Sequence, residues 1–163
     1  MNDIFMIPNA LKTKIKDLTS REILKQAILI RDIEDQISDD KTKKITFKKK
    51  EFSKDGDILS QEAINCDILN IDEAVNFFQA IHYYKIMNIK ERDIVYGKND
   101  FEIAIKDIED GDNLIEVETV SNNVNIDTIE KLKTQIIKLQ IPVDTSNFFV
   151  KKAEIELDKI IKR

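Results

Sequence analysis

The sequence from Ile86 to Glu118 reads IMNIKERDIVYGKNDFEIAIKDIEDGDNLIEVE, and this stretch decides the fold. Runs rich in Ile, Val and Tyr or Phe lie at 83–95, 101–108 and 114–120, and polar turns containing glycine separate them at 97–100 and 110–113. Such runs, separated by short turns, pair as antiparallel hairpins. The stretch therefore predicts a three-stranded meander.

The remainder of the chain adds strands before the meander and helices around it. At 43–50, apolar and lysine residues alternate with a period of two, which indicates a strand with one buried face. Asn70, with Glu73 three residues later, predicts the start of a helix. The other expected strands lie at 3–7, 27–34 and 58–69, with a turn at 53–57, and the helices at about 19–25, capped by Ser20, then at 71–81, from 125 or 127 towards Pro142, and from about 146. This order predicts an α+β fold in a single domain over residues 1–163.

Composition narrows the class of protein. The 163 residues carry a net charge of −5, so we expect no DNA partner, and a phosphate site would need a local cluster of Lys and Arg. Cys66 is the single cysteine, which excludes an internal disulfide. A basic leader and a long apolar run are both missing from the sequence, so we expect a cytoplasmic protein without a membrane partner.

Two pairs of charged residues stand out within the meander. Lys90 and Arg92 are two positions apart, so their side chains are expected on one face of a strand, and the same holds for Glu116 and Glu118. Paired cations suit phosphate oxygens, and paired carboxylates suit Mg²⁺ or Mn²⁺. A closed antiparallel sheet would place both pairs in one interior.

A plainer interpretation accompanies this one. Short K-x-R and E-x-E patterns commonly mark solvated strand faces with cross-strand ion pairs. The lysine-rich segment 41–54 is also typical of a solvated strand edge, and the lone His82 is typical of a structural or surface residue. The sequence contains no recognisable catalytic triad or zinc motif.

The order of these segments resembles the CYTH family of triphosphate tunnel enzymes along nearly the whole chain. The segment 90–118 carries the resemblance, because its K-x-R and its final E-x-E match the family pattern without a gap. Three further segments are similar to family strands: Asp3-Ile4-Phe5-Met6, Ala27-Ile28-Leu29-Ile30-Arg31 and Ile45-Thr46-Phe47-Lys48.

The resemblance implies an eight-stranded antiparallel tunnel with flanking helices, whose interior binds a small-molecule triphosphate or polyphosphate. It implies Mg²⁺ or Mn²⁺ as the cofactor. The triphosphate ligands that it implies are Arg31, Lys48, Lys90 and Arg92, with Lys106 as a further cation for anion binding, and the metal ligands are Glu62, Glu116 and Glu118.

The sequence also departs from the family pattern. The family's first strand carries E-x-E-x-K, which does not occur here, so we expect an incomplete tunnel with a sheet edge open to a homodimer partner. Leu29 replaces an arginine, Ser60 and Ile64 replace an arginine and a glutamate, and Lys106 replaces an aspartate that helps to organise the metal. These changes make the cavity more basic and weaken metal binding.

Three hypotheses follow. The first is a CYTH-type protein that binds a triphosphate compound or acts on it, either as a metal-dependent triphosphatase, such as a thiamine triphosphatase, or as a class IV-type adenylate cyclase. The second is a catalytically inactive binding or interaction module with the same fold. The third is an unrelated α+β protein whose charged strands are only solvated.

Overall fold

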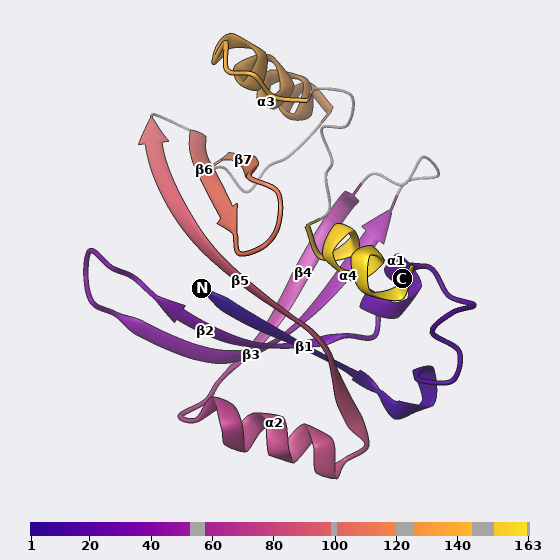
Figure 1. Cartoon of the computed structure of the whole chain (residues 1–163). Coiled ribbons are helices and arrows are strands. Elements are labelled where there is room, and N and C mark those ends of the chain that lie inside the picture. Colours follow the sequence, from indigo (N-terminus) through magenta and orange to yellow (C-terminus); the bar gives the residue numbers. More distant parts are fainter. Residues whose placement is uncertain (53–57, 99–100, 120–125, 145–151, 163) are drawn as a thin grey trace. The chain divides into compact units, whose positions relative to one another are not determined.

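The computed structural model describes residues 1–52, 58–98, 101–119, 126–144 and 152–162 (Figure 1). The order of strands and helices along them is much as the sequence predicts. The strands are β1 (Asn2–Pro8), β2 (Ile28–Glu34), β3 (Lys41–Phe52), β4 (Ile58–Asp67), β5 (Tyr83–Lys98), β6 (Phe101–Ile108) and β7 (Leu114–Thr119). The helices are a short 3₁₀ turn (Asn9–Leu11), α1 (Ser20–Leu24), α2 (Ile71–Ala80), α3 (Ile126–Lys138) and α4 (Lys152–Ile161).

All strand pairings are antiparallel, in the order β4-β3-β2-β1-β5-β6-β7, which confirms the α+β class. The chain divides into two compact units. Unit 1 contains residues 1–90 and 151–163, and unit 2 contains residues 91–150. Strand β5 belongs to both, because its first part pairs with β1 and its second part with β6. This division into two units does not test the expectation of a single domain, which stays a prediction.

Helix α2 covers one face of the sheet in unit 1. Ile4, Met6 and Ile30 alternate with residues of the opposite face and form a buried cluster with Ala74 and Phe78 of the helix. Asn70 caps this helix, since its side-chain oxygen accepts hydrogen bonds from the backbone N–H groups of residues 72 and 73. The predicted start of α2 is therefore confirmed.

Helices α1 and α4 lie on the other side of the unit 1 strands from α2 (Figure 1). Ile23 of α1 and Leu157 of α4 are completely buried. Thr19, rather than the predicted Ser20, caps α1: its hydroxyl accepts from the backbone N–H of Glu22, whose carboxylate accepts from the backbone N–H of Thr19. The prediction of Ser20 as the cap is wrong, because the Ser20 hydroxyl donates to Asp158 of α4 instead.

Unit 2 consists of the predicted meander, β5–β6–β7, and of helix α3, which contacts β7. The first meander strand is longer than predicted. Gly97 and Lys98 pair with Glu102 and Phe101, so the expected turn does not start at Gly97. The turn at 53–57 and the start of the last helix near 146 fall outside the described residues, and α4 is described from Lys152.

Strands β4 and β7 stand at the two ends of the described strand order, each with one pairing neighbour. A homodimer formed through a sheet edge stays a prediction. Among the described residues, every helix is too short or too polar to cross a lipid bilayer.

Candidate functional site

A row of cations lines the face of unit 1 that is turned away from α2. Arg31 pairs in register with Lys44, and β3 then places Lys48 and Lys50 at alternate positions on the same face. We call Arg31, Lys44, Lys48 and Lys50 the basic face. Two of the predicted triphosphate ligands, Arg31 and Lys48, are therefore brought together.

Lys48 is the unusual member of the basic face. Partial burial, and then repulsion from Arg31 and Lys50, lower the pKa of its amine to about 8. Lys152 of α4 adds to the repulsion, whereas Asp3 opposes it. Within the described residues, the Lys48 amine has no hydrogen-bond or ion-pair partner. The site therefore holds an excess of positive charge around an amine that an anion would stabilise in its charged form.

Arg31 is held differently, by Asp3 of β1. Its Nε and Nη2 donate to the two carboxylate oxygens at 2.8 and 3.0 Å, a bidentate ion pair of two register partners. The side chain of Asp3 is 3 % exposed and that of Arg31 is 14 % exposed. Sequence reasoning gave Asp3 no role. The available signal was a carboxylate within an otherwise apolar strand.

Lys90 and Glu62 lie on the α2 side of the unit 1 strands, not on the basic face. Lys90 pairs with Asn2, which is two positions from the α2-facing Ile4. Glu62 is exposed and pairs with Lys49, whereas the register partner of Lys48 is Ala63. The expectation that these residues share an interior with Lys48 does not hold, because a one-residue difference in register reverses the face of a strand side chain.

Arg92 and Glu116 lie on opposite faces of the unit 2 meander. Arg92 pairs with Asp107, whereas Glu116 pairs with Ala104, an odd number of positions from Asp107 on β6. Arg92 is exposed. The interior that was expected to hold both charged pairs is thus not formed within unit 2.

Lys106 instead occupies the centre of an acidic cluster in unit 2. Its Nζ donates to Asp93 Oδ2 at 2.9 Å and lies 3.2 Å from Glu116 Oε2. These carboxylates, with a smaller contribution from Glu91, raise the pKa of Lys106 despite the opposing effect of burial. A pocket of about 160 Å³ adjoins the cluster and is also lined by Val95, Glu102 and Ala104.

The residues present do not suit a divalent cation. Glu116 already shares an ammonium group with Asp93, and the exposed Glu62 belongs to the other unit. Glu118 pairs in register with Glu102, and its side chain is outside the described part of the chain. The described residues contain no group of three His, Cys, Asp or Glu side chains arranged to bind a metal. Mg²⁺ or Mn²⁺ as the cofactor stays a prediction that this arrangement does not favour.

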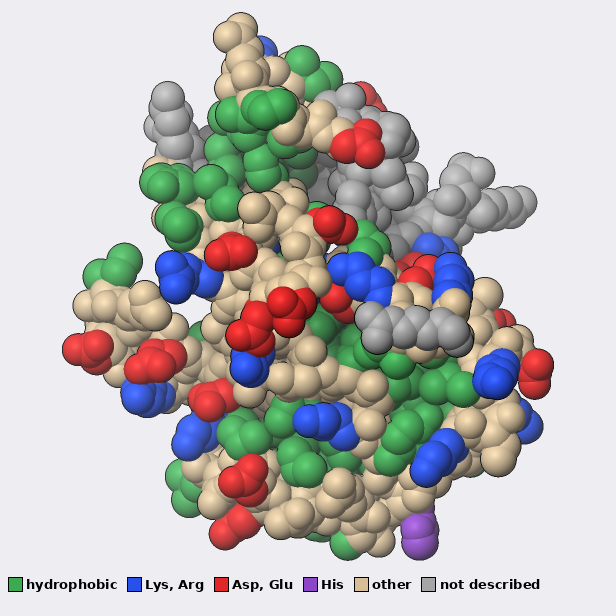
Figure 2. Space-filling model, viewed as in Figure 1, with side chains coloured by type: hydrophobic (Ala, Val, Ile, Leu, Met, Phe, Trp, Pro, Cys, Tyr) green, Lys and Arg blue, Asp and Glu red, His purple; other side chains and the backbone are tan. Residues whose placement is uncertain are grey.

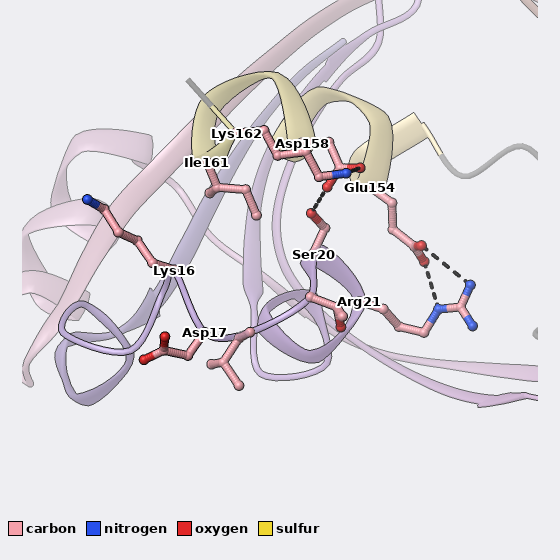
Figure 3. Close-up of a pocket in the computed structure, with 10 residues that line it drawn as sticks. Lys16, Asp17, Ser20, Arg21, Glu154, Asp158, Ile161 and Lys162 are labelled. Atoms are coloured by element: carbon pink, nitrogen blue, oxygen red, sulfur yellow. Dashed lines mark hydrogen bonds and ion pairs between the residues drawn. The ribbon is translucent and has the colours of Figure 1, made fainter.

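A second, larger pocket of about 610 Å³ lies between the segment 16–21 and helix α4 (Figure 3). Ser20 donates a hydrogen bond to Asp158, which also accepts from Lys162 at 2.6 Å, and these bonds lower the pKa of the aspartate. Arg21 pairs with Glu154 at 3.3 Å. Because these polar side chains satisfy one another, we interpret them as the contacts that hold α4 against α1. Sequence reasoning missed this pocket, whose partners are more than 130 residues apart.

On the side of the molecule shown in Figure 2, Lys and Arg side chains are interspersed with Asp and Glu. This mixture agrees with the net charge of −5.

The fold is shared with solved structures of archaeal proteins. The structure of the PH1819 protein from Pyrococcus horikoshii OT3 matches with a TM-score of 0.67 and 16 % identity, over 97 % of this chain and 83 % of that one. A conserved hypothetical protein from Pyrococcus furiosus matches with a TM-score of 0.56 and 16 % identity, over 85 % and 71 % of the two chains. The PH1012 protein from Pyrococcus horikoshii OT3 gives 0.53 and 14 %, over 85 % and 68 %. No protein-family model and no curated protein matches the sequence.

Proposed function

We propose that this protein binds a triphosphate or polyphosphate compound on the basic face of unit 1, with Lys48 at the centre of the site. The observation that carries the proposal is the electrostatic state of Lys48. Its pKa is lowered to about 8 in a setting where cations outnumber anions. A bound polyphosphate would reverse this imbalance and raise the pKa again.

The residues around Lys48 are suited to binding an anion that carries several negative charges. Lys44, Lys48 and Lys50 lie along one strand face: Lys48 and Lys50 are two positions apart, about 6–7 Å, and Lys44 is four positions from Lys48, about 13 Å. The distance between successive phosphates of a polyphosphate is smaller than the distance between Lys48 and Lys50 but comparable with it. Adjacent lysines can therefore bind different phosphoryl groups of one chain. Arg31 stays paired with Asp3 and therefore sets the shape of the site more than its charge.

The finer assignment of the fold belongs to the same proposal. The order of strands and helices fits an antiparallel tunnel of the CYTH type, and the resemblance of segment 90–118 points the same way. In such a tunnel the basic face would line the interior.

We favour binding over hydrolysis or cyclisation. Phosphoryl transfer depends on positioning and on cations, usually metal ions, that neutralise the developing charge. Of the predicted metal ligands, Glu116 is engaged by Lys106 and Glu62 is exposed on the α2 side of unit 1. The catalytically inactive module is thus the better-supported member of the two family hypotheses.

Calorimetric titration with tripolyphosphate, ATP and thiamine triphosphate tests the proposal. We expect Lys48→Met to weaken binding at least tenfold, about 1.4 kcal/mol. Lys49→Met is the matched control, because Lys49 is exposed and points to the other face of the same strand. Equal affinities of the two variants, or no binding by the wild type, would contradict the proposal.

A turnover assay separates binding from catalysis. The same compounds are incubated with Mg²⁺ or Mn²⁺, and the release of phosphate and the formation of cyclic nucleotide are measured. We expect neither. Turnover that is lost in Glu116→Gln would show instead that the protein is a metal-dependent enzyme.

A further inference from the structure

The cluster around Lys106 has the form of a cation site in which the cation is part of the chain. Asp93 on β5 is the register partner of Lys106 on β6, and Glu116 on β7 is the partner of Ala104, two positions away. All three side chains therefore lie on one face of unit 2, and the Lys106 Nζ lies within 3.2 Å of both carboxylates.

The enclosure of the ammonium group shows that it is a fixed part of this cluster. The Lys106 side chain is 14 % exposed, less than those of Asp93 and Glu116 at 25 % and 45 %. Glu91 contributes a third negative charge to its surroundings. Electrostatically, the ammonium compensates charges that would otherwise repel one another.

We infer that Lys106 is a built-in replacement for a divalent cation, so that Asp93 and Glu116 bind no Mg²⁺ or Mn²⁺ in the native protein. An ammonium and a hard divalent cation compete for the same carboxylate oxygens. Lysine also fills the space between the carboxylates, and its positive charge repels an incoming metal. This holds whether or not the basic face binds a phosphate compound.

A consequence is that removal of the ammonium creates a metal site. The carboxylates of Asp93 and Glu116 would then face the adjoining pocket of about 160 Å³, which has room for a cation with several of its water ligands. The small side chain of Ala104 leaves this space open between the neighbouring strands.

Titration with Mn²⁺, followed by the electron paramagnetic resonance signal of the free ion, tests the inference without any phosphate compound. We expect Lys106→Ser to gain one Mn²⁺ site with a Kd on the order of 10⁻⁴ to 10⁻³ M. We expect Lys106→Gln, which loses the positive charge but keeps most of the side-chain volume, to gain a weaker Mn²⁺ site. We expect Lys106→Arg to gain no site, and the double variant Lys106→Ser, Asp93→Asn to lose the gained one.

A second measurement compares the wild type with Glu116→Gln and does not depend on the folding of any Lys106 variant. We expect Glu116→Gln to leave the weak, nonspecific Mn²⁺ binding of the wild type unchanged. Saturable Mn²⁺ binding by the wild type that Glu116→Gln removes would overturn the inference. So would folded Lys106→Ser and Lys106→Gln variants, as judged by circular dichroism, that gain no Mn²⁺ site. Neither outcome bears on phosphate binding by Lys48, which the calorimetric test decides separately.

Discussion

Asp3 and Arg31 face each other across β1 and β2 and form a bidentate ion pair that is almost completely enclosed. Lys48 lies close enough to be affected by both charges. The pair thus combines two roles: it joins two central strands, and it limits the positive charge around the Lys48 amine.

Replacing Asp3 with asparagine should destabilise the protein. The change leaves the Arg31 guanidinium enclosed without its counter-charge, and the loss of one partner of a buried pair costs about 3–5 kcal/mol. Urea unfolding measures the difference. Asp32→Asn is the matched control, because this neighbour points to the other face and should change stability by less than about 0.5 kcal/mol. Equal effects of the two substitutions would mean that the ion pair contributes nothing.

The second prediction concerns the pH dependence of stability. The pKa of Lys48 is about 8 in the folded protein and near its ordinary value of 10.5 when unfolded, so the unfolded chain binds more protons between these values. The lysine therefore destabilises the fold fully below pH 8, and this cost disappears as the pH rises towards 10.5. We expect Lys48→Met to be more stable than the wild type by roughly 1–3 kcal/mol at pH 7.

The measurement is a set of urea unfolding curves for wild type and Lys48→Met between pH 7 and pH 10. The difference between the two proteins should shrink as the pH rises. Lys49→Met, whose side chain is exposed, should show no such trend. A stability difference that stays constant with pH would contradict the lowered pKa.

Binding of a polyphosphate should be accompanied by proton uptake at Lys48. At pH 8 the free amine is about half protonated, and a bound anion drives it towards full protonation, so up to about half a proton is taken up. Calorimetric titration in two buffers with different ionisation enthalpies measures this number. We expect affinity to fall above pH 8. In Lys48→Arg, which stays charged, both the uptake and the fall should be missing.

The capping box of α1 gives a fourth prediction. Thr19→Ala removes the hydroxyl that accepts from the backbone N–H of Glu22, at a cost of about 1 kcal/mol. Hydrogen exchange should show faster exchange of this amide. Ser20→Ala is the comparison, since it keeps the cap and removes only the hydrogen bond to Asp158. The same acceleration in both variants would show that docking of α4, and not the cap, protects this amide.

The sequence predicted most elements correctly, because alternation along strands and the cap at Asn70 are local signals. It could not predict which face each charge would take. The pairing of Arg92 with Asp107 depends on where the strands turn, and extension of β5 to Lys98 differs from the expected turn at Gly97. One residue in register decides whether a side chain shares a face with Glu116.

Local sequence patterns also could not predict ion pairs and hydrogen bonds between residues that are distant in sequence. Lys106 was expected among the anion ligands, but its ion pair with Asp93 arises from the hairpin register. The contact between Ser20 and Asp158 joins segments from opposite ends of the sequence, and no periodicity in either segment encodes it.

The division of the chain also sets the order in which it can fold. Unit 2 is one continuous segment, so its hairpins join residues that are close in sequence and can form early. Unit 1 is discontinuous: β1 needs β5, with Asn2 opposite Lys90, and α1 needs α4. During synthesis on the ribosome, β1 can therefore pair with β5, its second neighbour in the sheet, only after more than half of the described chain has been made. Helix α4 follows every other described element in the chain, so the packing of α1 against it is completed only after the rest of unit 1 has been synthesised.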